Sequence, residues 1–362
     1  MGVQMDTSQG SGYWEPHSSS VDFCEANYLH GKIVAEPHNA WSSLIFVAFG
    51  VVGALHRPGC QERMFLLPHL VLISIGLGSA AFHSTLHWFW QSTDEVPMLW
   101  LNMSHLYILV VIHIESGILG ANQNKNALMQ WTALVFWLIT ICYTFFYYSY
   151  RAFYAVFLVT FSTTTTAIIL WTAYMVFVRN DRKLDNLQLQ LWKCAFTSFV
   201  AFGFVPWVID MNLCGRLDTY YNSLPGFFKG WTLHILWHIS SGYGAHLLNQ
   251  LLQCQWIRLH EQIVKEKYGK EASQHHKDRG VRLSWVMWFI PVLDIQQGCF
   301  STGKPNDWEK MVMIKSAGLF EREGSNINNN CMKNLFFGLT FLGQSILSLC
   351  ASYFFPGYSS SN

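Results

Sequence analysis

Long apolar runs recur along this chain and constrain its fold more than any other feature. A helix of about 20 apolar residues crosses the ~30 Å hydrocarbon layer of a membrane. Stretches near this length lie at residues 40–56, 64–83, 95–117, 127–148, 153–178, 189–211 and 231–256. Only 12% of the residues are charged, against roughly 25% in soluble domains. We therefore predict an all-α integral membrane protein built as a seven-transmembrane helix bundle.

The segments around these runs predict a division of the chain into four parts. Residues 1–39 form a polar, acidic arm, and residues 40–256 form the seven-transmembrane domain. Residues 257–333 are a charged tail and linker. Residues 334–356 contain an uncharged run of spanning length, expected as either an eighth membrane helix or a helix packed on the surface.

The tail has features of its own. Residues 261–282 are charged and are expected as an extension of the last helix or as a linker. Residues 284–293 are apolar but too short to span a membrane, which is typical of an interfacial segment. Residues 301–333 are polar and predict a linker.

The distribution of basic residues predicts the orientation of the bundle. Lys and Arg are concentrated in the connections between the first and second, third and fourth, and fifth and sixth runs, and again in the tail. Basic loops stay on the cytosolic side of a membrane. We therefore expect a lumenal N-terminus and a cytosolic tail after the seventh run. The net charge of +1 and the lack of a Gly-rich phosphate loop give no indication of a nucleic-acid partner.

Histidines provide the first candidate site. His234 and His238 lie four residues apart, so both imidazoles face one side of a helix. The predicted topology brings His83, at the end of the second run, and Asp94, before the third, to the same membrane depth. Three imidazoles with a water in the fourth position form a typical catalytic zinc site. Histidines near helix ends can instead lie at the membrane interface or form hydrogen bonds within a helix bundle. His87, four residues after His83, is a competing metal ligand. Spacing alone leaves these interpretations open.

Ser79 and Asp94 flank the proposed zinc ligand His83. A carboxylate beside a metal can act as general base for an attacking water. A serine hydroxyl one turn from a ligand can stabilise the oxyanion of an attacked carbonyl. The alternatives are a small residue that lets helices pack closely, for Ser79, and a helix N-cap, for Asp94.

The N-terminal arm is rich in oxygen ligands. Asp22, Glu25, Asn27 and Glu36 supply three carboxylates and an amide within fifteen residues. Such hard ligands suit calcium, although the spacing is not that of an EF-hand. An ordinary acidic surface turn is the alternative.

Two of the nine cysteines differ from the rest. Cys24 and Cys214 both fall on the predicted lumenal side, where disulfides persist. Most of the others lie in or near apolar runs and are expected to pack as small hydrophobic residues. We predict a disulfide between Cys24 and Cys214 that ties the arm to the connection before the last run.

Taken together, these motifs resemble the alkaline ceramidase family, which belongs to a wider superfamily with the adiponectin receptors. The specific combination is Ser-Ala-Ala-Phe-His at 79–83, Asp-Glu-Val-Pro-Met at 94–98 and the late His-x3-His at 234–238. Arm motifs at 12–16, 21–28 and 35–39 and the segment 210–214 add to it, so the resemblance extends over roughly residues 12–295.

The resemblance implies an amidohydrolase with an intramembrane zinc site. In that family pattern, His83, His234 and His238 would be the zinc ligands, with Ser79 and Asp94 as catalytic residues. The expected reaction is hydrolysis of the amide of ceramide, dihydroceramide or phytoceramide to a sphingoid base and a fatty acid. The expected location is the membrane of the endoplasmic reticulum or Golgi.

The resemblance also implies a structural or regulatory calcium ion and a disulfide. The calcium ligands would be the side chains of Asp22, Glu25, Asn27 and Glu36 and the backbone carbonyl of Phe23. Cys24 and Cys214 match the disulfide of the family.

Three departures and two rival functions accompany the resemblance. Residues 91–94 read Gln-Ser-Thr-Asp where the family usually has Gln-Leu-x-Asp, residues 87–90 are unusually aromatic, and no family counterpart is recognised from residue 301 onward. The main rival is a receptor or sensor of the adiponectin-receptor kind with a structural zinc ion. The second is a haem protein that uses His83 and His87 against the later pair.

Overall fold

The computed structural model describes residues 12–56, 63–117, 124–149, 154–178, 185–275, 281–286 and 290–295. The helices are α1 (Pro37–Leu55), α2 (Arg63–Thr85), α3 (Trp88–Glu115), α4 (Lys125–Ser149), α5 (Tyr154–Phe177), α6 (Asn186–Phe196), α7 (Val205–Ser223) and α8 (His234–His275). A π-helical segment η1 (Thr197–Phe204), a 3-10 turn η2 (Gly226–Phe228) and two strands, β1 (Val281–Val286) and β2 (Ile290–Ile295), complete the elements. The described chain is mostly helical, as predicted.

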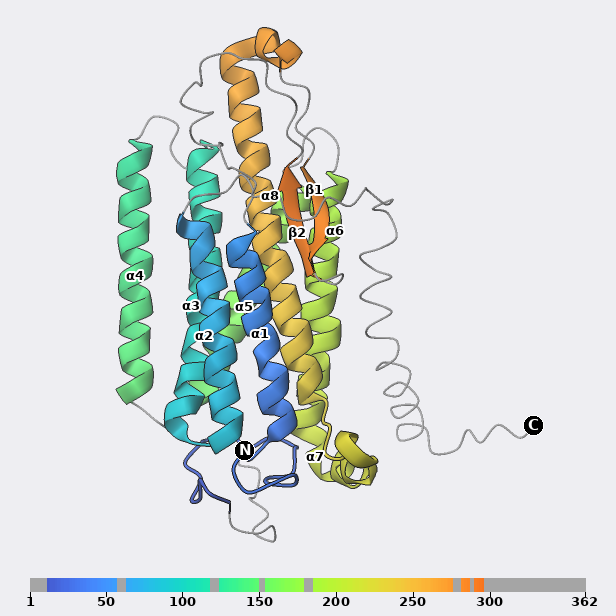
Figure 1. Cartoon of the computed structure of the whole chain (residues 1–362). Coiled ribbons are helices and arrows are strands. Elements are labelled where there is room, and N and C mark those ends of the chain that lie inside the picture. Colours follow the sequence, from blue (N-terminus) through green and yellow to red (C-terminus); the bar gives the residue numbers. More distant parts are fainter. Residues whose placement is uncertain are drawn as a thin grey trace, which may run out of the picture.

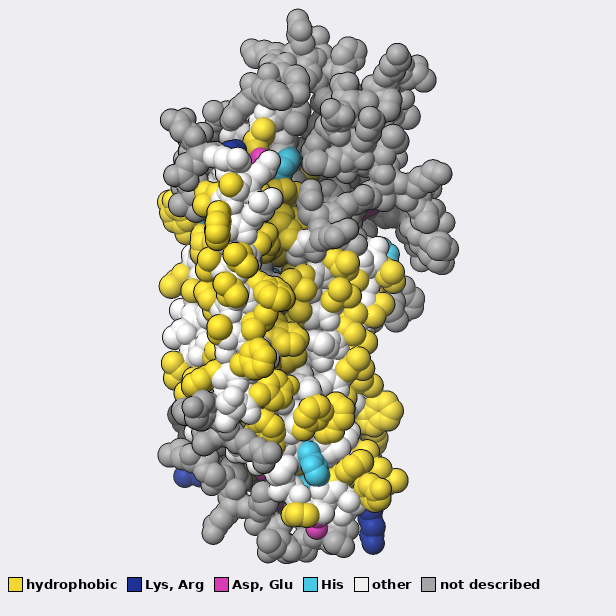
Figure 2. Space-filling view, turned by 90° about the vertical axis from the view of Figure 1, so that its left-hand side faces the viewer, with side chains coloured by type: hydrophobic (Ala, Val, Ile, Leu, Met, Phe, Trp, Pro, Cys, Tyr) yellow, Lys and Arg dark blue, Asp and Glu magenta, His cyan; other side chains and the backbone are white. Residues whose placement is uncertain are grey.

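Six helices of the described chain are long and apolar enough to cross a membrane. They are α1, α2 from Met64 onward, α3, α4, α5 and the continuous helix formed by α6, η1 and α7 (Asn186–Ser223). Each coincides with one of the predicted runs. Figure 2 shows the corresponding broad belt of apolar side chains, with charged side chains near its two ends. The protein is therefore a multi-pass helical membrane protein.

The last predicted run, 231–256, lies in α8 from His234 onward and is part of a much longer helix of 42 residues. Figure 1 shows α8 beside α1 and reaching well past the ends of α1 and α2. The side chains of α8 are buried over most of its first half, polar ones included. These polar groups distinguish α8 from the six apolar helices. Its extension to His275 agrees with the expected helix extension for the first part of 261–282.

Close helix packing around α8 depends on glycines. A Cβ atom at Gly244 would lie 3.0 Å from the Phe199 side chain and 3.1 Å from the Ala195 carbonyl oxygen. The turn of π-helix at η1 packs against this surface, and Ser198 Oγ donates to the Ser240 carbonyl at 2.7 Å. α8 can therefore approach the sixth apolar helix almost backbone to backbone.

The described part of the tail forms two strands. Residues 281–286 and 290–295 form an antiparallel pair in which Val281 lies opposite Ile295 and Val286 opposite Ile290. The place of segment 284–293 at the membrane interface stays a prediction. Ile290 and other apolar side chains of β2 are buried. Two buried polar side chains of α8, His246 and Gln250, bond to the backbone of β2, so the hairpin packs on α8. The predicted linker 301–333 and the helix at 335–355 lie outside the described residues.

Candidate metal centre

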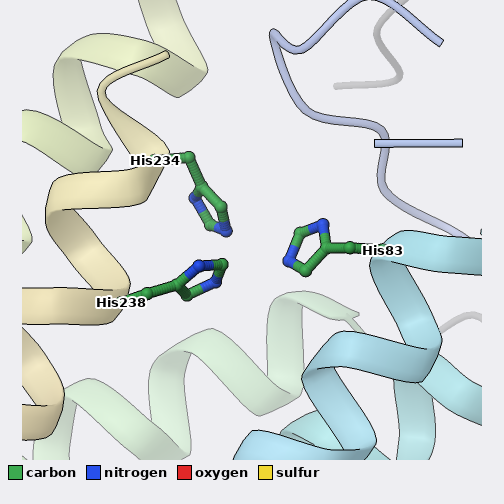
Figure 3. A group of neighbouring side chains, drawn as sticks. All are labelled: His83, His234 and His238. Atoms are coloured by element: carbon green, nitrogen blue, oxygen red, sulfur yellow. The ribbon is translucent and has the colours of Figure 1, made fainter. Parts of the chain in front are cut away.

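Three histidines from α2 and α8 form a compact buried group. His83 lies in the last turn of α2, and His234 and His238 lie in the first two turns of α8. Figure 3 shows the ring of His83 facing the other two rings. One nitrogen from each ring lies within 4.8 Å of the others. Among the residues that the structure describes, no other group of three or more His, Cys, Asp or Glu converges in this way.

The chemistry of this group fits a metal ion. His83 Nε2 and His234 Nδ1 are buried and have no hydrogen-bond partner. A buried polar atom without a partner costs about 1–3 kcal/mol, so two on facing rings call for a shared ligand. His238 Nδ1 bonds to Ser42 Oγ at 2.7 Å, which fixes that ring and leaves its other nitrogen for a ligand. Three neutral imidazoles are a donor set that zinc favours.

Glu36 holds the ring of His83. Its Oε2 lies 2.5 Å from His83 Nδ1, and both side chains are fully buried. A carboxylate on one nitrogen of a ligating histidine fixes the ring so that the other nitrogen faces the metal. Sequence analysis assigned Glu36 only to calcium. It missed this contact because the two residues lie 47 positions apart, and no spacing rule connects them.

We expect Glu36→Gln to weaken zinc binding by about 10- to 100-fold, the usual cost of losing a partner of a metal ligand. The amide is nearly isosteric but carries no charge to orient the His83 ring. A competition titration with a chromophoric zinc chelator measures the change. Glu15→Gln is the matched control, since Glu15 is an exposed residue of the same arm. Equal zinc affinities in the two variants would contradict this role for Glu36.

Ser79 and Asp94 meet where α2 and α3 approach most closely. A Cβ atom at Gly78 would lie 2.1 Å from the Thr93 carbonyl oxygen, so only glycine permits this approach. Ser79 Oγ bonds to the Asp94 carboxylate and receives a hydrogen bond from Ser43 Oγ at 3.0 Å. The small residue that lets the two helices pack closely is thus Gly78. The close approach that it permits brings Ser79 and Asp94 together.

Asp94 is not a helix N-cap. α3 begins at Trp88, earlier than predicted, so Asp94 lies in its second turn. The Trp88 amide instead donates to Ser18 Oγ of the arm at 3.0 Å. Ser79, Asp94, His234 and His238 line one cavity. The carboxylate therefore lies in the same space as the imidazoles.

His87 lies outside the histidine group. Its Nε2 bonds to the Trp14 carbonyl oxygen at 2.9 Å, so it fastens the arm to the start of α3. Of the two candidates, His83 and not His87 belongs to the converging group. The haem interpretation needs His83 and His87 as one of two facing pairs, and the structure does not bring that pair together.

The arm places its carboxylates near the histidines, although they do not converge as closely as the three imidazoles do. Asn27 Nδ2 donates to Asp22 at 3.3 Å, while the buried Asn27 Oδ1 has no partner. Burial, with a contribution from the nearby Glu36, raises the pKa of Asp22 to about 7 and that of Glu25 to about 9. Burial raises the pKa of Glu36 to about 7. Carboxylates with raised pKa values gain from a nearby cation. Phe23, from the same part of the arm, packs on His234, with ring centroids 3.9 Å apart.

Glu25 has a further contact that sequence analysis did not identify. Its two carboxylate oxygens accept the backbone N–H groups of His38 and Asn39 at 2.7 and 2.8 Å. These N–H groups lie in the first turn of α1, where they have no partner within the helix, so Glu25 caps that helix. The arm is therefore docked on the helix that carries Ser42.

The arm is also tied to α7 and α8. Cys24 and Cys214 form a disulfide with their Cα atoms 5.3 Å apart. Asp210, from the same segment of α7, accepts hydrogen bonds from the Leu233 backbone N–H at 3.2 Å and the Tyr221 hydroxyl at 3.0 Å. Asp210 thus fixes the chain immediately before His234. Sequence analysis noted the motif at 210–214 but gave Asp210 no role.

These features define a class: a multi-pass helical membrane protein with a buried three-histidine site that can hold a metal ion, beside a serine–aspartate pair. Residues 15–277 match the sequence model of the family described as Ceramidase. The chain therefore belongs to the ceramidase family, and the resemblance drawn from its motifs is confirmed.

Relatives from animals and yeast agree with this assignment. Alkaline ceramidase 1 of Mus musculus is 30% identical over 295 residues, which cover 77% of this chain and 92% of the relative. Alkaline ceramidase 3 of Mus musculus is 26% identical over 248 residues, covering 65% and 83%. Alkaline ceramidase YPC1 of Saccharomyces cerevisiae is 24% identical over 246 residues, covering 65% and 76%.

Proposed function

We propose that this protein is a zinc-dependent alkaline ceramidase, which hydrolyses the amide bond of ceramide to a sphingoid base and a free fatty acid. The observation that carries the proposal is the placement of Ser79 and Asp94 in one cavity with His234 and His238, in a chain of the ceramidase family. The names of the relatives supply the substrate class. A receptor or sensor with a structural metal would have no use for the hydrogen-bonded serine and carboxylate.

The residues of the site divide the chemistry between them. His83, His234 and His238 would hold zinc, which when bound polarises the amide carbonyl and lowers the pKa of a water molecule. Asp94 takes the proton of the attacking water and later delivers a proton to the leaving amine. Ser79, bonded to Asp94 in the free protein, turns its hydroxyl to the oxyanion as the carbonyl is attacked. The orientation of His83 by Glu36 and of His238 by Ser42 keeps the imidazoles in place throughout.

The setting of the site suits a lipid. Its cavity has apolar walls that include Phe157, Leu158 and Trp207. A two-chain substrate can therefore leave the bilayer for the site without passing through water. In this proposal α8 is the seventh transmembrane helix, the arm is lumenal and the tail cytosolic, in the endoplasmic reticulum or Golgi.

Calcium is the second ion in the proposal. Asp22, Glu25, Asn27 and Glu36 would bind it together with the carbonyl of Phe23. It would act by bracing the arm, because Phe23 lies on His234 and Glu36 lies on His83. This calcium has no chemical step of its own and would tune the activity through the geometry of the histidines.

The test of the proposed function is hydrolysis by the purified full-length protein. We expect release of one fatty acid for each sphingoid base, complete loss of activity after zinc is removed with a chelator, and recovery when zinc is restored. Mass spectrometry of both products and metal analysis of the same samples provide the measurement. Zinc-loaded, folded protein that releases no fatty acid from any ceramide would favour the receptor function instead.

Calcium is expected to raise the unfolding temperature by roughly 5 °C at pH 8 and by much less at pH 6. With their raised pKa values, Asp22 and Glu36 keep protons when folded that they would release when unfolded. Calcium-free stability therefore falls as pH rises from about 4 to about 7. Calcium replaces those protons, so its binding strengthens over the same window.

Thermal unfolding with and without calcium measures this effect. Asp22→Asn should remove most of the calcium-dependent shift, and Glu15→Gln, in the exposed part of the arm, should keep it. A shift that is the same at both pH values, or that survives Asp22→Asn, would exclude this calcium site.

A further inference from the structure

Ser43 of α1 lies between a histidine of the metal centre and the candidate catalytic pair. Its side chain is fully buried, and its Oγ lies 3.0 Å from Ser79 Oγ and 3.5 Å from His238 Nδ1. The same Oγ lies 2.7 Å from the Asn39 carbonyl oxygen, one turn earlier on α1. The single hydroxyl proton of Ser43 therefore has two oxygen acceptors within reach, on Ser79 and on Asn39.

The acceptor that Ser43 chooses determines where the hydroxyl of Ser79 points. If Ser43 donates to Ser79, the proton of Ser79 goes to the Asp94 carboxylate, with which Ser79 forms a hydrogen bond. If Ser43 donates to Asn39, the two serine oxygens face each other at 3.0 Å, and Ser79 must turn its own proton to Ser43 to fill the contact. In this second arrangement Ser79 has no proton left for Asp94 or for an oxyanion.

The contacts of the Asn39 carbonyl favour the first arrangement. A carbonyl oxygen has two lone pairs and accepts two hydrogen bonds well. In an α-helix the Asn39 carbonyl accepts the backbone N–H of Ser43, four residues later. Ser42 Oγ lies 3.1 Å from the same oxygen as a second donor. These two bonds occupy the acceptor, so the hydroxyl proton of Ser43 is left for Ser79.

The direction of the Ser42 proton is fixed in turn by His238. His238 Nδ1 lies 2.7 Å from Ser42 Oγ. With Nε2 left to bind a metal ion, Nδ1 carries the proton of the neutral ring and donates it to Ser42. The hydroxyl of Ser42 must then donate elsewhere, and the Asn39 carbonyl is its acceptor. One consistent set of donors thus leads from the ring of His238 to the candidate catalytic pair.

The bond from Ser43 also holds the oxygen of Ser79 in place. A serine side chain can adopt three staggered rotamers, and this bond favours the one that keeps Oγ beside Asp94. The proton of Ser79 can then rotate from Asp94 to the oxyanion without movement of the oxygen. Donors fixed in advance stabilise an oxyanion without reorganisation during the reaction. A donor whose own oxygen accepts a hydrogen bond is also the stronger one.

We propose that Ser43 is a positioning residue of the hydrolytic site, which directs the hydroxyl proton of Ser79 toward the reacting atoms. This inference rests on the proposed ceramidase function. Ser43 does not line the cavity of the site, and in this role it acts only through Ser79. The contact between the two serines joins residues 36 positions apart, so no local pattern in the sequence predicts it.

The first test is the kinetics of Ser43→Ala in the purified full-length protein. We expect kcat for ceramide to fall by about three- to tenfold, the contribution of one hydrogen bond between neutral groups, while KM and the zinc content stay at wild-type values. Steady-state kinetics and metal analysis of the same preparation provide the measurements. Ser104→Ala is the matched control and should leave kcat unchanged, because Ser104 is a buried serine that bonds to the Leu101 carbonyl oxygen of its own helix at 2.7 Å.

A second pair of variants separates the hydroxyl from the shape of the side chain. Threonine and valine have nearly the same size, but only threonine can donate a hydrogen bond. Ser43→Thr should therefore be faster than Ser43→Val by about the same three- to tenfold factor. Equal kcat values for these two folded variants would mean that the site needs only the right volume at this position, and would overturn the proposal.

A double-mutant cycle tests whether Ser43 acts through Ser79. Ser79→Ala removes the hydroxyl that Ser43 is proposed to direct, so adding Ser43→Ala to it should cost no further activity. A merely structural role of Ser43 would cost the same factor with and without that hydroxyl. If wild-type protein hydrolyses ceramide but the two losses multiply, this inference is overturned while the proposed function stands. If wild-type protein hydrolyses no ceramide, the proposed function fails and the inference fails with it.

Discussion

His234→Ala is expected to lose most of its bound zinc and to hydrolyse ceramide at least about a thousandfold more slowly than wild type. The variant leaves two imidazoles where three converge within 4.8 Å, so the ion would lose one of its protein ligands. A bound metal contributes several kcal/mol to a reaction of this kind, and each 1.4 kcal/mol is a factor of ten in rate. Zinc content and product release should be measured on the same preparations.

His246→Ala is the matched control for this prediction. His246 lies three turns later on α8, is equally buried and bonds to the hairpin at Pro291. Its removal should lower stability but leave the zinc content near that of wild type. Turnover by His234→Ala at wild-type zinc content would contradict the assignment of the metal centre.

The membrane-spanning helices could be predicted because their signal is local. A run such as 127–148 must be a helix if it is to satisfy its backbone in lipid, whatever the rest of the chain does. The histidine group required one further step. The predicted topology showed that His83 and the pair at 234–238 lie on the same side of the membrane. The structure brings the three together.

Other features could not be predicted, because they arise from contacts between distant residues. Nothing near Glu36 in the sequence shows that its carboxylate bonds to His83, or that Ser42 bonds to His238. The start of α3 was placed too late because residues 88–94 contain polar groups. Those groups form part of a helix because the arm caps it through Ser18.

The hairpin and the polar contacts that join α2, α3 and α8 show the same limit. Residues 284–293 are aromatic and apolar, which is typical of a segment at the membrane interface. The described parts of this segment, 284–286 and 290–293, form strands, and the backbone of β2 bonds to the buried His246 and Gln250 of α8. His69 and His105 read individually as bundle histidines. Their shared bonds to Asn249 become apparent only once the helices are packed.

Asp94→Asn is expected to retain its zinc and to bind ceramide with nearly unchanged KM, while kcat falls by about 10²- to 10⁴-fold. Asparagine keeps the shape of the side chain and can still bond to Ser79, but it cannot take a proton from water or deliver one to the amine. A fall in kcat without a matching change in KM is the signature of an interaction made in the transition state. Steady-state kinetics and metal analysis on the same protein separate this loss from the loss of a ligand.

The adjacent carboxylate provides the matched control. Glu95 is also buried in α3, but Gln91 Nε2 donates to it at 2.8 Å and the Tyr147 hydroxyl donates to its other oxygen. Those bonds tie Glu95 to its own helix and to α4, so Glu95→Gln should change kcat by less than about tenfold, far less than the loss of a general base. Equal losses in the two variants would mean that a buried charge at the start of α3, and not a proton carrier at Asp94, is what the reaction requires. A large loss confined to Asp94→Asn would assign the proton transfers to the carboxylate that Ser79 contacts.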